Sequence, residues 1–120
     1  KNPVNIKFVN AYKKYAIDHK LPNADKVVTN DPMEATYVGI NMWKQAVEKA
    51  GSTDVDKVRA AMAGQSFAAP SGYTLTMDAE NHHLYKPVMI GQIRADGQFD
   101  VVYKTKDAIK AEPWSPYIPK

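Results

Sequence analysis

The stretch that decides the fold runs from Asn30 to Gly51 and reads NDPMEATYVGINMWKQAVEKAG. It predicts a helix in which Asp31 is the N-cap, Pro32 occupies the first helical position and Glu34 completes a capping box. Gly51 supplies the left-handed residue that commonly ends a helix. Apolar residues recur at helical spacing between these signals, and they are Ala35, Val38, Met42, Ala46 and Ala50, with Trp43 and Val47 widening the stripe. So broad a stripe predicts that the helix packs against a large partner.

Two further helices flank this one in the sequence. The first is capped by Asn2 and extends to about Asp18, and the third is capped by Ser52 or Thr53 and closed by Gly64. After Gly64 the pattern changes to strand-like alternation, with strands expected over 67–69, 73–77, 87–94 and 99–103. The last two strands form a hairpin, since Asp-Gly between them marks a tight turn. The expected fold class is α/β, with three helices followed by short antiparallel strands and a Pro-rich tail.

Composition narrows the class of protein. The chain has 120 residues, 44% hydrophobic and 24% charged, which suits one globular domain. No run of about 20 apolar residues is present, so no membrane-spanning helix is expected. The net charge of +3 is spread along the chain without a basic and aromatic cluster, which argues against nucleic-acid binding. The absence of cysteine excludes disulfides, a thiol nucleophile and thiolate metal ligands.

The predicted elements lack a partner layer. Apolar helix faces must pack against a sheet or other helices, and the pattern after Gly64 provides only short antiparallel pairs. We therefore expect the sequence to be a piece of a longer protein. We also expect the piece to self-associate, because uncovered apolar faces favour association.

The residues that could carry catalysis do not form a constellation. His82 and His83 are adjacent, and neighbours on an extended strand point to opposite sides, so a shared metal ion is not expected. Ser71 lies in a Pro-Ser-Gly turn and not in a Gly-x-Ser-x-Gly elbow. Helix dipoles or turns account for the candidate carboxylates, which are Asp54, Asp56, Asp78 and Glu80. We expect no catalytic residue, no metal, no cofactor and no enzymatic activity.

Glu34 and Tyr37 are the candidates for ligand binding. Both lie in the first turns of the central helix, whose amino-terminal end could face a cleft and hold a polar ligand. Capping by Glu34 and packing by Tyr37 are the alternative roles for these side chains.

Three blocks of sequence carry a family resemblance, namely DPMEA at 31–35, NHHL at 81–84 and WSPY at 114–117. With them, nearly the whole chain resembles the carboxy-terminal part of type I periplasmic solute-binding proteins of ABC transporters. The similarity is to the branch that binds urea, short-chain amides and branched-chain amino acids, and the urea-binding members are the most similar.

This resemblance implies two α/β lobes that are joined by three crossovers and close on a small ligand. Residues 1–76 would be the helical part of the first lobe, and residues 77–120 would be a crossover, a hairpin of the second lobe and the tail. The implied function is to bind urea or a short-chain amide in the periplasm and deliver it to membrane permease subunits. A branched-chain amino-acid binding protein and a cytoplasmic amide-sensing regulator of the same fold are the alternatives.

Overall fold

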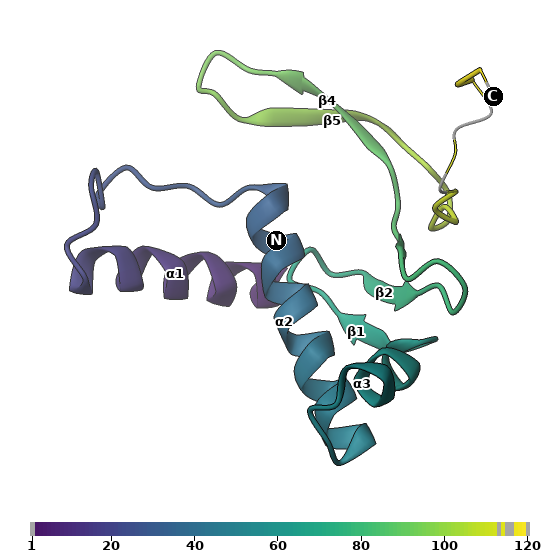
Figure 1. Ribbon diagram of the computed structural model, residues 1–120. Coiled ribbons are helices and arrows are strands. Elements are labelled where there is room, and N and C mark those ends of the chain that lie inside the picture. The colour runs from purple at the N-terminus through teal and green to yellow at the C-terminus, as the bar shows by residue number, and fades with distance from the viewer. Residues whose placement is uncertain (1, 113, 115–116, 120) are drawn as a thin grey trace.

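The computed structural model describes residues 2–112, 114 and 117–119. Its elements in chain order are α1 (Pro3–Asp18), α2 (Asp31–Ala50), α3 (Val55–Met62), β1 (Ser66–Ala68), β2 (Thr74–Met77), β3 (Leu84–Tyr85), β4 (Met89–Ile93) and β5 (Phe99–Lys104). The prediction of an α/β chain with three helices followed by short antiparallel strands is confirmed (Figure 1). The two-residue strand β3 was not predicted, since so short a strand leaves no alternation in the sequence.

The start of α2 differs from the prediction by one residue. Asn30, and not Asp31, is the N-cap, because Asn30 has extended backbone angles and its side-chain oxygen accepts a hydrogen bond from the Met33 N–H at 3.1 Å. The predicted capping box is also wrong, because the Glu34 carboxylate accepts a hydrogen bond from a distant residue instead. The predicted end at Gly51 is confirmed by its left-handed φ of 60°.

The cap of α3 was also placed too early. Asp54 is the N-cap and accepts a hydrogen bond from the Lys57 N–H, whereas the Ser52 hydroxyl accepts one from the Asp54 N–H and so shapes the preceding turn. For α1, the predicted cap at Asn2 and the end at Asp18 are both confirmed.

Two small antiparallel sheets follow the helices. Strands β1, β2 and β3 form the first sheet in that order, and β4 pairs only with β5 in the second. The main core lies between α2 and the first sheet, where Val38 and Met42 pack with Leu75 and Met77. A second cluster joins α2 to α3 through Ala46, Val58 and Ala61. The central residues of the predicted stripe are therefore buried, but Trp43 is 51% exposed in this chain.

Helix α1 and the β4–β5 hairpin leave most of their residues exposed to solvent. Figure 1 shows α1 running across the direction of α2, and the β4–β5 hairpin extending away from the helices. Helix α1 covers little of the core in this chain, because Ala16 is the single buried residue among those described in α1, and Val4 and Tyr15 are more than half exposed. Every residue of β4 and β5 is exposed.

The overall dimensions agree with this open arrangement. The solvent-accessible area is 9199 Å², whereas a compact protein of this mass exposes about 6,500 Å². The radius of gyration is 17.0 Å, compared with about 14 Å for a compact domain of this length. About 2,700 Å² is therefore available for covering by another surface. No helix in the described ranges is long and apolar enough to cross a membrane.

Candidate functional site

The amino-terminal half of α2 is tied to the turn at residues 70–72. Glu34 Oε1 accepts a hydrogen bond from the Ser71 N–H at 2.6 Å, and Asn2 donates from Nδ2 to the Pro70 carbonyl oxygen at 2.9 Å. Gly72 has a φ of 92°, and a Cβ there would lie 2.6 Å from Asn2 Nδ2. The left-handed φ favours glycine at this position, whereas the contact with the Asn2 side chain would require only a shift of its amide group. These contacts hold the turn against the start of α1 and the first turns of α2.

A polar cavity of about 240 Å³, here called the Glu34 cavity, opens beside this turn. Its lining residues are Asn5, Phe8, Thr29, Asn30, Asp31, Glu34 and Ser71. Within the described part of the chain, the Ser71 hydroxyl oxygen is buried and has no hydrogen-bond partner. The cavity therefore offers carboxylate, amide and hydroxyl groups to a molecule of a few non-hydrogen atoms.

Tyr37 does not share this cavity with Glu34. It lines a neighbouring hollow of about 240 Å³, and Phe8 lies between the two hollows and lines both. The Tyr37 ring packs against Phe8 at a centroid distance of 5.1 Å and against Phe67 at 6.1 Å. The two predicted ligand residues therefore line separate hollows that share Phe8, and the Tyr37 ring packs against two other aromatic rings.

An ion pair places the start of α2 next to the segment that leads to the hairpin. Asp31, which lines the Glu34 cavity, accepts a hydrogen bond from the Lys86 ammonium group, although 55 residues separate them. The Glu34 cavity thus lies at the end of α2 that is close to Lys86 and the segment leading to the hairpin.

Asp78, one of the candidate carboxylates of the sequence analysis, is the buried charged residue among those that the structure describes. Its side chain is placed directly after β2 and the residue is 3% exposed. As predicted, it lies in a turn, where Oδ1 accepts hydrogen bonds from the N–H groups of Glu80 and Asn81. In addition, Oδ2 accepts a hydrogen bond from the Tyr85 hydroxyl at 2.5 Å and lies 3.6 Å from Lys110 Nζ.

These partners change the acid–base properties of all three side chains. The Tyr85 hydroxyl, with the backbone N–H groups of Asn81 and Glu80, holds the pKa of the Asp78 carboxyl well below its usual range. In turn, the hydrogen bond to Asp78 raises the pKa of Tyr85, and the negative charge of Asp78 raises the pKa of Lys110. Asp78 is therefore a firmly ionised carboxylate that holds its neighbours.

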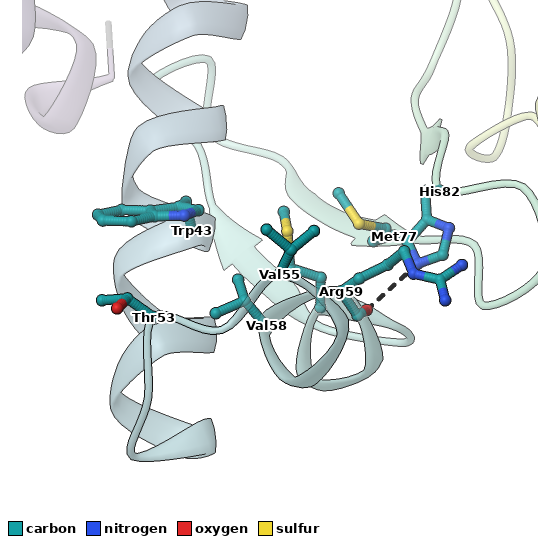
Figure 2. Close-up of a pocket in the computed structure, with 8 residues that line it drawn as sticks. Trp43, Thr53, Val55, Val58, Arg59, Met77 and His82 are labelled. Carbon is teal, nitrogen blue, oxygen red and sulfur yellow. Dashed lines mark hydrogen bonds between the residues drawn. The ribbon is translucent and has the colours of Figure 1, made fainter.

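A larger and mostly apolar groove of about 520 Å³ lies between α2, α3 and the end of β2. Figure 2 shows Trp43 from α2, Val55 and Val58 from α3 and Met77 from β2 around this groove, with His82 beside Arg59. His82 Nε2 lies 3.3 Å from the Arg59 carbonyl oxygen. The groove suits apolar groups, and Thr53, Arg59 and His82 are the polar residues of its lining.

The two histidines of the 81–84 block are not brought together at a shared ligand. His82 is partly buried at the groove, while His83 is exposed. Across the described ranges, no group of three or more His, Cys, Asp or Glu side chains is arranged to hold a metal ion. The positions of Asp54 and Asp56 at the start of α3 agree with their predicted role at the positive end of the helix dipole.

The structure is thus an α/β chain with a polar cavity beside the segment that leads to the hairpin, an arrangement that suits a ligand-binding domain. The chain belongs to the periplasmic binding protein domain family, whose sequence model matches residues 1–120. This is a family of small-molecule binding proteins and not of enzymes. The fold is therefore that of part of a type I periplasmic binding protein.

One curated relative is a protein of Geobacillus stearothermophilus named "Limonene hydroxylase", which is 38% identical over 112 residues. The alignment covers 92% of this chain and 19% of the relative, so the chain spans about a fifth of the length of that relative. The name describes the whole of a much longer protein.

Proposed function

We propose that this chain is part of the substrate-binding component of an ABC importer, which binds urea or a short-chain amide and delivers it to permease subunits. In this proposal residues 1–76 belong to the first lobe, and residues 77–120 provide a crossover, a hairpin of the second lobe and the tail. The ligand lies in the cleft between the lobes, and the protein works in the periplasm.

The Glu34 cavity is the observation that carries this proposal. A cleft between two lobes is bounded by the segments that cross between them, and the Asp31–Lys86 ion pair joins the cavity wall to such a segment. The lining supplies the Glu34 carboxylate, which can accept hydrogen bonds from amide N–H₂ groups, together with the polar side chains of Asn5 and Thr29. Urea and short-chain amides carry the complementary donors and acceptor.

Glu34 and Tyr37 have different weights in this proposal. Glu34 lines the polar cavity and keeps a second carboxylate oxygen beyond the one bound to Ser71. Tyr37 is held by aromatic packing and contributes to ligand binding by positioning Phe8, which lines both hollows.

Calorimetric titration of the full-length protein with urea, acetamide, formamide and leucine tests the proposal. We expect urea or an amide to bind and Glu34→Gln to weaken that binding at least tenfold, about 1.4 kcal/mol. Glu48→Gln is the matched control, because it removes an exposed carboxylate of the same helix that pairs only with Lys44 among the described groups. Equal affinities in the two variants would remove Glu34 from the ligand site.

The same titration separates the alternatives. Preferential binding of leucine would identify a branched-chain amino-acid binding protein. A cytoplasmic amide-sensing regulator would bind amides but would remain in the cytoplasmic fraction, and cell fractionation of the full-length protein distinguishes these locations.

A further inference from the structure

The hairpin is joined to the rest of the chain by two segments that lie side by side. We call residues 84–88 the outgoing segment and residues 105–111 the returning segment. Lys86 and Ile109 exchange backbone hydrogen bonds of 3.3 and 3.0 Å, and the Val88 carbonyl oxygen accepts one from the Thr105 N–H at 2.9 Å. The orientation of β4–β5 therefore depends on how this pair of segments is fixed to the first sheet.

One buried carboxylate contacts both segments. Asp78 follows β2 directly, and its Oδ2 accepts a hydrogen bond from the Tyr85 hydroxyl on the outgoing segment. The same oxygen lies 3.6 Å from Lys110 Nζ on the returning segment. The neighbouring Asn81, whose N–H donates to Asp78, also donates from Nδ2 to the Ala111 carbonyl oxygen at 2.9 Å.

We propose that Asp78 is the positioning residue of the hinge, and that its carboxylate fixes the angle between the helical part and the β4–β5 hairpin. This inference rests on the proposed function, in which these two parts belong to the two lobes that close on the ligand. Hinges are small sets of residues at the ends of elements, where limited changes of backbone angle move whole domains. Asp78 acts at such a place, between β2 and both connecting segments.

Asp78 can fix this angle because separating a buried charge from its hydrogen-bond donors costs free energy. Tyr85 is held beside Asp78 by the pairing of β3 with β2, whereas Lys110 lies outside this sheet. Asp78 is 3% exposed, so a swing of the hairpin that removes Lys110 leaves a buried carboxylate with fewer partners. Hydrogen bonds to charged groups are stronger than neutral ones, and an unsatisfied buried charge is costly. The arrangement therefore favours one orientation and resists others.

A narrower alternative is that Asp78 only stabilises its own turn through the N–H groups of Glu80 and Asn81. Tyr85→Phe separates the two roles, because it removes the hydroxyl that ties the end of β3, from which the chain leaves for the hairpin, and leaves the turn bonds in place. Lys110→Gln does the same on the returning segment. Tyr103→Phe is the matched control, since it removes an exposed hydroxyl within β5.

The chain has no cysteine, so two spin labels can be placed without background. Suitable exposed sites are Lys49 at the end of α2 and Gln98 in the hairpin turn, each changed to cysteine. Pulsed electron–electron double resonance then measures the distance between the two labels. An excess of unlabelled chain suppresses the signal from labels on different molecules. Circular dichroism confirms that each variant is folded.

We expect one narrow distance distribution in the parent, and a broadened or shifted distribution in both Tyr85→Phe and Lys110→Gln. Tyr103→Phe should match the parent. Parent-like distributions in both hinge variants would overturn the proposal and leave Asp78 as a turn residue. The measurement needs no ligand, so its failure is separate from a failure of urea or amides to bind in the calorimetric titration.

Discussion

Replacing Phe99 with serine should weaken self-association of this 120-residue chain about 30-fold. Phe99 is 62% exposed and pairs with Ile93 across the hairpin, and both lie on the same face as Val101. The chain exposes about 2,700 Å² more than a compact protein of its mass, whereas a stable interface needs only about 800 Å² from each partner. A second copy that covers this hairpin face is therefore the expected occupant when the chain is alone.

The magnitude follows from the burial of one aromatic side chain. Covering a phenylalanine contributes about 2 kcal/mol, and this corresponds to about a 30-fold change in the dissociation constant. Sedimentation equilibrium over a range of concentrations measures that constant. Val28→Ser is the control, because Val28 is similarly exposed but lies in the connection between α1 and α2. A parent chain that stays monomeric at about 100 μM, or equal effects of the two substitutions, would refute the reasoning.

Leu75→Ala should lower the free energy of unfolding by about 3 kcal/mol, because it leaves a cavity between α2 and the first sheet; Leu75→Met should cost less than about 1.5 kcal/mol, and urea denaturation distinguishes them. Asn30→Ala should cost about 1 kcal/mol through loss of the α2 cap, measured in the same way, and no effect would contradict the cap assignment. The lowered pKa of Asp78 means that its contribution is present above the usual carboxyl pKa and declines as the pH falls below about 4, so the stability difference between the parent and Asp78→Asn should shrink from pH 5 to pH 2. The raised pKa values of Tyr85 and Lys110 act at alkaline pH, so the contributions of these two groups to stability are present at neutral pH and lost above about pH 10. A stability difference between the parent and Asp78→Asn that stays constant at both acid and alkaline pH would contradict this linkage.

The elements were predictable from the sequence because local signals specify them. Helix α2 is an example, because its signals are the helical spacing of Val38, Met42 and Ala46 and the terminating Gly51, all of which lie close together in the sequence. These signals predicted the N-cap of α2 to within one residue. The cap was misplaced since Asn30 and Asp31 are both good capping residues, and the sequence does not show which has the extended backbone.

The candidate site was only partly predictable because its contacts link distant residues. Glu34 was identified as a candidate, but its bond to Ser71 spans 37 residues and no local spacing reveals it. Asp78 was correctly placed in a turn, whereas its burial and its contact with Lys110 depend on where the returning segment lies. The sequence offers no signal for such long-range pairs.

The attachment of α1 has a consequence for how the chain opens. One buried residue, Ala16, and the contacts of Asn2 and Phe8 connect this helix to the remainder, whereas α2 carries both apolar clusters. Segments with few buried apolar contacts open first in native-state fluctuations. We therefore expect amide protons of α1 to exchange well before those of α2, and trypsin to cut first at Lys20 or Lys26 in the exposed connection. The chain would lose its amino-terminal helix as a separate cooperative unit while the α2 core stays intact.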